Sequence, residues 1–356
     1  MVRTMSLLRA LLSTARGLRP PGGHPRAPAW HAPQFADGLP PDHAVLLDAP
    51  DERLAPALVA AAFGDHEPAA KLLATTRGAA EWESRDRYVM RLAAFARGRD
   101  EWLTGWLAAT PHDPDALLVK AEVAVRTAWE SPARSERLRE LGRLIDAAAE
   151  ADPRDPVPWR LALDHARGTH ATHTAFETLW EQAVRRAPHH YGCHVAALKY
   201  LSAQRRGSHG SHRECFDFAE QAAADALPGS LIRALPVRAA LARLGAGDAG
   251  SVPWDRVDSA ADLAIELSGR YAVADPWPAE VRNVLVYVLA GRERWAAALD
   301  QFRLIGPYAT SFPWSSVSDD PLGRFLDARD GVRREVASAV PQRGRAGRGR
   351  SGGHYA

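Results

Sequence analysis

Apolar residues recur along the chain at intervals of three and four, and several of these runs end at a proline. Residues at this spacing share one face of an α-helix, so each run predicts a buried stripe followed by a turn. The stripe positions lie twelve, eight and five residues before the proline: Leu141, Ile145 and Ala148 before Pro153; Phe176, Trp180 and Ala183 before Pro188; Trp295, Leu299 and Phe302 before Pro307.

Helix-starting signals lie between the stripes. Proline is favoured in the first turn of a helix, because a backbone N–H there would have no hydrogen-bond partner within the helix. At four points a proline directly follows a capping residue: Asp113-Pro114, Ser131-Pro132, Asp155-Pro156 and Asp320-Pro321. Ser211 and Glu214 have the spacing of a capping box, and Asp100 can begin a short helix. Periodicity predicts further helices over 52–63, 67–76, 80–97, 190–203, 211–226, 230–244, 255–268, 278–290, 293–305 and 321–339. No convincing alternating run predicts a strand, so we expect an all-α protein.

The turns recur at a roughly constant interval. Pro111, Pro153, Pro188 and Pro228 are separated by 42, 35 and 40 residues. A stripe that cannot be buried within its own hairpin must be covered by the neighbouring hairpin. The spacing therefore predicts degenerate helical hairpins, related to the tetratricopeptide (TPR) type, stacked as an α-solenoid.

One hairpin carries the resemblance to TPR units most clearly. Leu163 lies in its first predicted helix, Trp180 and Ala183 lie in its second, and Pro188 follows that second helix. It departs from the TPR pattern at Phe176, where that pattern has a small residue. The stretches DPRDPVPW, APHHYGCHVAALKYLS, GSHRECFDFA and AGRERWAAALDQFRLIGP are similar to a bacterial, high-GC family of TPR-like proteins of unknown function. The resemblance covers roughly 50–335. It implies a fold and no activity.

Composition divides the chain into three parts. Residues 1–44 are rich in Pro, Gly, Ala and Arg, and residues 341–356 are rich in Gly and Arg. Neither can bury enough apolar surface to offset the entropy of ordering, so we expect both to be disordered around a helical-repeat domain over 45–340. No stretch approaches ~20 uninterrupted apolar residues, and the N-terminus lacks the unbroken apolar run of a secretory signal, so we expect a cytoplasmic protein with no membrane partner.

Charge is unevenly distributed. The net charge of +2 includes nine arginines near the ends, five in residues 1–36 and four in residues 341–356, with no acid in either stretch. Removing these nine leaves about −7 for the helical body. An acidic body argues against a broad nucleic-acid footprint, although the basic tails keep a nucleic-acid-associated protein open as an alternative.

Histidines and both cysteines concentrate in residues 165–215. The segment holds His165, His170, His173, His189, His190, Cys193, His194, His209, His212 and Cys215. The spacings His190-x-x-Cys193-His194 and His209-x-x-His212-x-x-Cys215 are ligand-like, because zinc takes imidazole nitrogen and thiolate sulfur. The alternative is that the histidines are solvated turn residues and the cysteines buried thiols. We favour this alternative and assign no metal, catalytic or cofactor-binding residue, while a metal-dependent protein or enzyme stays open.

Acidic pairs and tryptophans also admit a functional interpretation. Asp319 with Asp320, and Glu81 with Glu83, lack a neighbouring nucleophile, so we interpret them as residues of solvated helix faces.

The tryptophans could line a ligand groove. However, Trp159, Trp180 and Trp295 fall on predicted stripes, whereas Trp254, Trp277 and Trp314 lie beside prolines and are expected to cover turns. The sequence therefore predicts a non-catalytic module that binds a protein or peptide.

Overall fold

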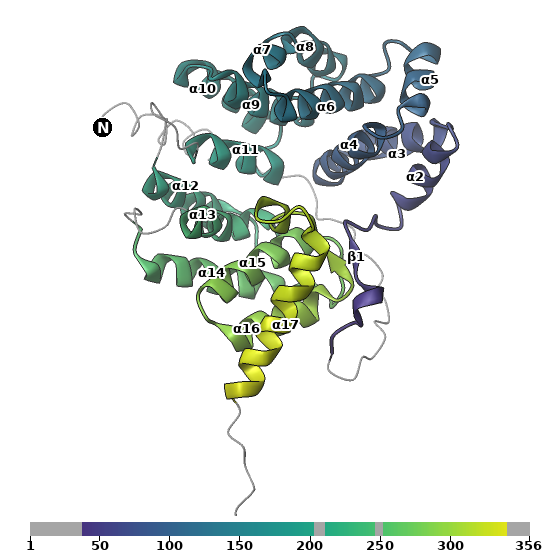
Figure 1. The fold of residues 1–356 in the computed structure, drawn as a ribbon. Coiled ribbons are helices and arrows are strands. Elements are labelled where there is room, and N and C mark those ends of the chain that lie inside the picture. Colours follow the sequence, from purple (N-terminus) through teal and green to yellow (C-terminus); the bar gives the residue numbers. More distant parts are fainter. Residues whose placement is uncertain (1–37, 203–210, 246–251, 340–356) are drawn as a thin grey trace, which may run out of the picture.

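The computed structural model describes residues 38–202, 211–245 and 252–339, and in these ranges the protein is almost entirely helical (Figure 1). The first group of helices is α2 (Ala55–Ala62), α3 (Glu67–Gly78), α4 (Trp82–Ala96), α5 (Glu101–Ala109), α6 (Pro114–Glu130), α7 (Arg134–Arg139), α8 (Gly142–Ala151) and α9 (Val157–Thr169). The second group is α10 (His173–Arg186), α11 (Tyr191–Leu201), α12 (His212–Asp225), α13 (Leu235–Leu244), α14 (Trp254–Ser268), α15 (Ala279–Gly291), α16 (Trp295–Ile305) and α17 (Pro321–Ala339).

Short elements complete the fold. They are the 3-10 turns η1 (Asp42–Ala44), η2 (Leu231–Ala234) and η4 (Trp314–Ser316), and the strands β1 (Leu46–Leu47) and β2 (Tyr308–Ala309). The all-helical prediction is therefore confirmed for the described part of the chain. The predicted helix over 230–244 is divided into η2 and α13, because Pro236 has no N–H with which to continue the helical hydrogen bonds.

The predicted caps differ in how they work. Asp113 accepts hydrogen bonds from the backbone N–H groups of Asp115 and Ala116, and Ser211 accepts one from Glu214. By contrast, Asp100 precedes α5 without a capping hydrogen bond from its side chain. Helix α5 therefore owes its position to packing, since Trp102 and Trp106 are both buried.

The stripes form the core. Phe176, Trp180 and Ala183 of α10 are fully buried. In the other stripes the residues nearer the proline are buried, and Leu141 and Trp295 are half-buried. Among the tryptophans beside prolines, Trp314 is buried, Trp277 is half-buried under the Arg87 guanidinium, and Trp254 lies exposed between Arg243 and Arg292.

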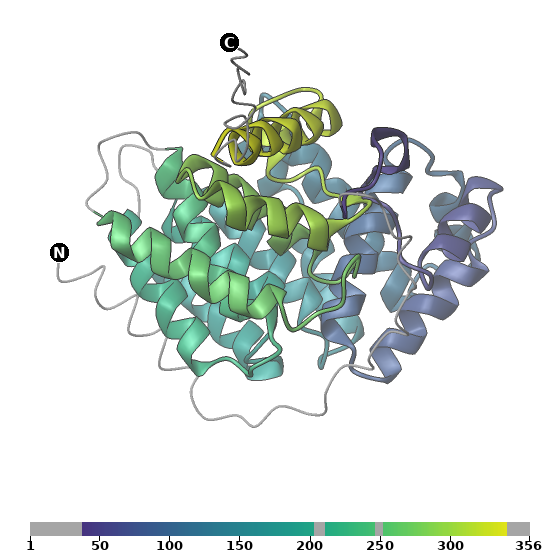
Figure 2. The same ribbon diagram turned by 90° about the horizontal axis from the view of Figure 1, so that it is seen from below.

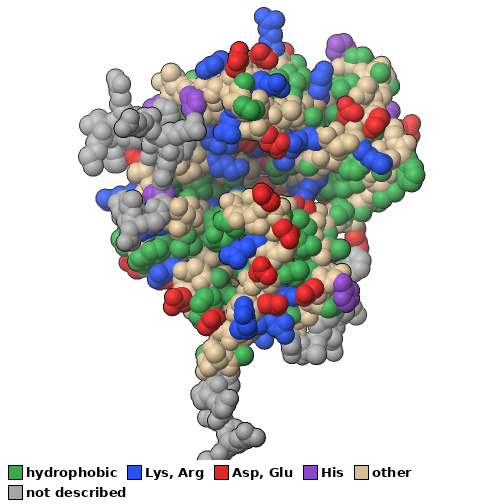
Figure 3. Space-filling model, in the orientation of Figure 1, with side chains coloured by type: hydrophobic (Ala, Val, Ile, Leu, Met, Phe, Trp, Pro, Cys, Tyr) green, Lys and Arg blue, Asp and Glu red, His purple; other side chains and the backbone are tan. Residues whose placement is uncertain are grey.

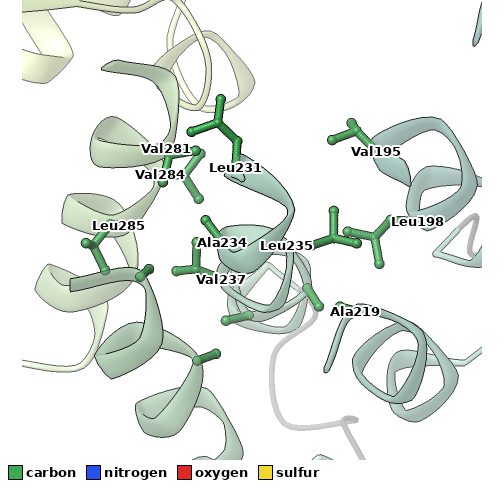
Figure 4. Packing of buried hydrophobic residues seen from close by; sticks show 14 of the residues in the cluster. Val195, Leu198, Ala219, Leu231, Ala234, Leu235, Val237, Val281, Val284 and Leu285 are labelled. Carbon is green, nitrogen blue, oxygen red and sulfur yellow. The ribbon is translucent and has the colours of Figure 1, made fainter. Parts of the chain in front are cut away.

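Buried apolar side chains form two clusters that meet at α9. Leu161 and Ala162 belong to the cluster of the first group, while Leu163 and Ala166 belong to that of the second. Figure 4 shows the second cluster, in which α13 lies between α11 and α15: Leu235 faces Leu198 on one side, and Val237 faces α15 on the other. Helix α9 is thus the apolar link between the two groups.

The two groups also meet through a pair of short strands and through α4. Strand β1 pairs in parallel with β2, with Leu46 opposite Tyr308 and Leu47 opposite Ala309. Arg87 of α4 donates to the carbonyl of Trp277 at 2.6 Å. Figures 1 and 2 show the resulting arrangement, with the first helices brought beside the segment around β2.

Residues 38–44 are folded, although the sequence predicts that they belong to a disordered segment. They include η1 and contact α17, because Arg329 donates to the carbonyl of Pro40 at 3.0 Å and forms an ion pair with Asp42. Arg329 is buried and needs acceptors, so this short stretch belongs to the folded body. The rest of that segment (1–37) and the expected tail 341–356 lie outside the described residues.

Candidate functional site

The histidines of 165–215 are spread over several helices. His165 bonds the carbonyl of Leu138 through Nε2 at 2.7 Å, and His173 lies edge-on to Tyr200 with ring centroids 5.9 Å apart. His170 ends α9 in a left-handed conformation, with φ of 58°. His209 lies outside the described residues. Within the described ranges no three His, Cys, Asp or Glu side chains are grouped so that they could hold a metal ion.

The interpretation of the histidines as solvated turn residues is wrong for two of them. His190 and His194 are both buried, in or next to α11. His190 caps this helix, since its Nδ1 accepts the backbone N–H of Cys193 at 3.2 Å and lies 3.1 Å from the Cys193 sulfur. On the other side of the ring, Nε2 lies 3.7 Å from a carboxylate oxygen of Asp86 in α4. His190 therefore joins α4 to α11, a contact between residues more than a hundred positions apart.

His194 occupies an apolar pocket. Its ring lies edge-on to Trp180 and stacks on Phe218, with centroids 5.1 and 6.1 Å away. Its Nδ1 donates to the carbonyl of His190 at 2.9 Å. Burial lowers the pKa of His194 to about 4, because the cation would lose its hydration there. His194 is consequently neutral at physiological pH and acts as a core residue.

Both cysteines are free, buried thiols, as expected from the sequence. Burial raises the pKa of Cys193, and it raises that of Cys215 to about 12. Both are therefore protonated at neutral pH, whereas the thiolate is the nucleophile and the metal ligand. The Cys193–His190–Asp86 arrangement has the order of a nucleophile, a base and an orienting acid, but the three residues are buried. A substrate could not reach the sulfur in this conformation.

Sequence reasoning missed a network of buried charges in the first group of helices. Arg85 of α4 forms ion pairs at 2.6 Å with Asp115 of α6 and Asp155 before α9, and it donates to the carbonyl of Leu73 at 3.0 Å. All three charged side chains are buried. Asp155 also accepts the backbone N–H of Val157, the first residue of α9, although the N-cap position itself is Pro156.

A second buried group lies beside the first. Arg160 of α9 pairs with Asp86 at 2.9 Å and with Glu122 of α6 at 2.7 Å. Burial opposes ionisation of Glu122, but Arg160 and Arg126 outweigh it, so the pKa of Glu122 lies below its ordinary value. Each guanidinium thus ties three helices together. The desolvation of both charges offsets much of the attraction in a buried ion pair, but removing one partner leaves the other charge buried and uncompensated.

Three of the four carboxylates in the acidic pairs have structural partners. Glu81 pairs with Arg53 at 2.6 Å, and Glu83 accepts the backbone N–H of Tyr191 at 2.6 Å. Asp320 accepts the N–H of Gly323 at the start of α17. None of these contacts places the carboxylate beside a nucleophile.

The remaining candidate is a series of charged residues on four helices that contact one another in turn, α9, α11, α13 and α15. This inner charged track consists of Asp164, Lys199, Arg238 and Glu280. Arg238 forms an ion pair with Glu280 and donates to the hydroxyl of Tyr191 at 3.1 Å. The Lys199 side chain is exposed, and its ammonium forms no hydrogen bond or ion pair with any described residue.

Burial and neighbouring charges change the pKa of Lys199. Desolvation lowers its pKa, Asp164 opposes the shift, and Arg238 and Arg167 reinforce it. Figure 3 shows a central hollow between the two groups of helices, with Lys and Arg side chains gathered on its walls; α11, α13 and α15 border it in Figure 1. The inner charged track itself contains two cations, Lys199 and Arg238, and two carboxylates, Asp164 and Glu280.

No family model matches the chain, and neither the curated proteins nor the solved structures contain a match. None of the described helices combines the length and apolar character needed to cross a membrane.

Proposed function

We propose that this protein is a non-catalytic helical-repeat module that holds a protein or peptide segment in the central hollow. The observation that carries the proposal is the inner charged track. The alternate helices α9, α11, α13 and α15 contribute Asp164, Lys199, Arg238 and Glu280, and their charges interact across helix boundaries. Stacked helical hairpins commonly bind an extended segment through side chains supplied by consecutive helices.

The unpaired ammonium of Lys199 supports a ligand that carries carboxylates. Arg238 already has Glu280 and Tyr191 as partners, so its charge is largely satisfied within the protein. Lys199 is the cation of the track that keeps donors free for a partner, and an exposed charge of this kind mainly sets specificity and association rate. We propose a partner segment with acidic residues, bound in the cytoplasm.

The chemistry of the buried groups supports a binding role over the enzymatic alternative. The thiols are protonated, the buried carboxylates are engaged by arginines, and the Cys193–His190–Asp86 set is closed to solvent. The metal-dependent alternative would need ligands brought together from dispersed helices, and no observation on the described residues favours it.

The test is affinity capture from native cells with the full chain and with two lysine variants. Lys199→Glu reverses the charge in the track, while Lys120→Glu reverses an exposed lysine of α6 that has no ion pair. We expect the captured partner to be lost with Lys199→Glu and retained with Lys120→Glu, with both variants melting like the parent. A partner captured equally by all three proteins would contradict binding through the track, and a partner lost with both would indicate non-specific attraction.

A further inference from the structure

Arg238 of α13 is held in a fixed orientation by its neighbours. Its side chain is 9% exposed. One nitrogen, Nη1, forms an ion pair with Glu280 and donates a hydrogen bond to the hydroxyl of Tyr191 at 3.1 Å. The guanidinium carbon also lies over the ring of Phe312, 4.7 Å from its centroid. Because these contacts restrain the plane of the guanidinium, the N–H groups that they leave unused point in a fixed direction.

Two of these N–H donors have no acceptor among the described residues. Nothing there accepts from Nε or Nη2 of Arg238, and neither nitrogen is enclosed, so both are open to solvent. The two nitrogens form one edge of the guanidinium, which matches two oxygens of a single anion. Three other arginines use that edge in this way: Arg77 on Asp115, Arg256 on Glu220 and Arg292 on Asp258. At Arg238 the same edge is left for a ligand.

Lys199 of α11 is the neighbouring cation. It follows Tyr191 by about two helical turns, so the two side chains share a face of α11, and Tyr191 contacts Arg238. Burial lowers the pKa of Lys199, Asp164 opposes this shift, and the charge of Arg238 adds to it. The two cations are therefore close enough to repel each other, and the Lys199 ammonium has no hydrogen bond to a described residue.

The other cations that act on this part of the track are engaged within the protein. Arg87 donates through both terminal nitrogens to backbone carbonyls, and Arg167 pairs with Asp164. Unused donors therefore concentrate at Arg238 and Lys199.

The unused donors match a phosphoryl group. A phosphate monoester carries about −1.5 to −2 charges near neutral pH and has three acceptor oxygens. Two of these oxygens fit the Nε–Nη2 edge of Arg238, and the third can accept from the Lys199 ammonium. The charge of the group also balances both cations at once. A carboxylate has one negative charge and two oxygens, so it would fill the edge and leave much of the repulsion between the cations in place.

We propose that Arg238 and Lys199 bind a phosphoryl group on the segment held in the central hollow, through Nε and Nη2 of Arg238 and the ammonium of Lys199. The site rests on the proposed function, because it lies in the same hollow, and it defines the partner further. The acidic residue of the partner that reaches this part of the track is a phosphorylated serine, threonine or tyrosine. Arg238 supplies the geometric selection and Lys199 the second positive charge.

The test is acetylation of the purified full chain in the presence of inorganic phosphate, with each lysine followed by peptide mass spectrometry. The chain has three lysines, Lys71, Lys120 and Lys199, and all three are exposed. Only the neutral amine is acetylated, and a bound anion holds the amine protonated. We expect saturating phosphate to slow acetylation of Lys199 roughly tenfold, which corresponds to a pKa raised by about one unit, and to leave Lys71 and Lys120 unchanged. Acetate at the same ionic strength should protect Lys199 much less.

Two arginine variants test the role of the guanidinium edge. Arg238→Lys keeps the positive charge opposite Glu280 but removes the edge, so protection of Lys199 by phosphate should be lost. Arg292→Lys is the matched control, because Asp258 takes the same edge of that residue, and its protection should equal that of the parent. If Arg238→Lys fails to fold, the comparison of phosphate with acetate on the parent decides.

Three results would overturn the proposal. Protection of all three lysines alike would mean general screening by salt. Protection by acetate equal to that by phosphate would mean that the site takes carboxylates. Protection that persists in a folded Arg238→Lys variant would mean that Lys199 acts without the arginine.

Partner capture separates this site from the proposed function. A captured partner that depends on Lys199, without protection by phosphate, contradicts the phosphoryl site alone. Protection by phosphate without a captured partner contradicts the proposed function alone.

Discussion

The imidazole of His194 lies edge-on to the indole of Trp180, with ring centroids 5.1 Å apart, and both side chains are buried between α10, α11 and α12. A histidine in this position must stay neutral. Protonation of the His194 imidazole would therefore disturb the packing of α10 on α11.

Stability should fall as the pH drops from about 6.5 toward 4, in part through His194. Its pKa is about 4 in the folded protein and ordinarily 6.5, so the unfolded chain binds a proton first and is favoured in this window. The full difference corresponds to ~3 kcal/mol. Urea unfolding across this range should show a smaller loss for His194→Phe than for the parent. The exposed control His112→Gln should follow the parent, and a His194→Phe curve parallel to the parent would contradict the assignment.

Trp180→Ala should cost roughly 3–5 kcal/mol, because the side chain is 1% exposed and its removal leaves a cavity. Trp254→Ala is the comparison, since that indole is exposed and held between two guanidinium groups; we expect ~1–2 kcal/mol from the lost cation–π contacts. Chemical denaturation measures both. If Trp180→Ala keeps its stability and loses a binding partner, the residue is a binding anchor.

Arg160→Met should destabilise the protein by about 3–5 kcal/mol, because it leaves Asp86 and Glu122 buried without their cation. Arg154→Met is a matched control: its side chain is 74% exposed and stands 3.5 Å from Asp152, so the loss should stay within ~1 kcal/mol. Equal losses in the two variants would mean that burial of the Arg160 network contributes nothing specific.

Gly192→Ala should be strongly destabilising. A Cβ at this position would lie 2.1 Å from a carboxylate oxygen of Asp86, which is itself held by Arg160. Gly105→Ala, in the middle of α5 with open space around it, should stabilise by ~0.5–1 kcal/mol, the ordinary gain for a helix interior. Thermal melts of the two variants should therefore shift in opposite directions.

Removing residues 1–44 should lower stability more than removing residues 1–37. The longer deletion takes away Pro40 and Asp42, the acceptors of the buried Arg329 guanidinium, at a cost of ~1.5–3 kcal/mol. Arg329→Met should remove the difference between the two deletions, which makes it the control. Identical melting of both deletions in the parent background would show that the contact between η1 and α17 is dispensable.

The local sequence determines where the helices begin and which face of each is buried. The stripe of Phe176, Trp180 and Ala183 predicts the buried face of α10, and the Asp320-Pro321 signal predicts the start of α17, because periodicity and capping depend on residues within a few positions of one another. The burial of both cysteines was also expected from their size and reduced state.

Tertiary structure alone decided which polar residues are buried. Sequence alone does not single out Arg85 or Arg160, because buried carboxylates that pair with them lie 30 or more positions away, at Asp115 and Glu122. His190 and His194 likewise become core residues only when α4, α10 and α12 close around α11. A side chain's local pattern sets its helix, but its burial depends on which distant helix covers it, and that is a property of the packed chain.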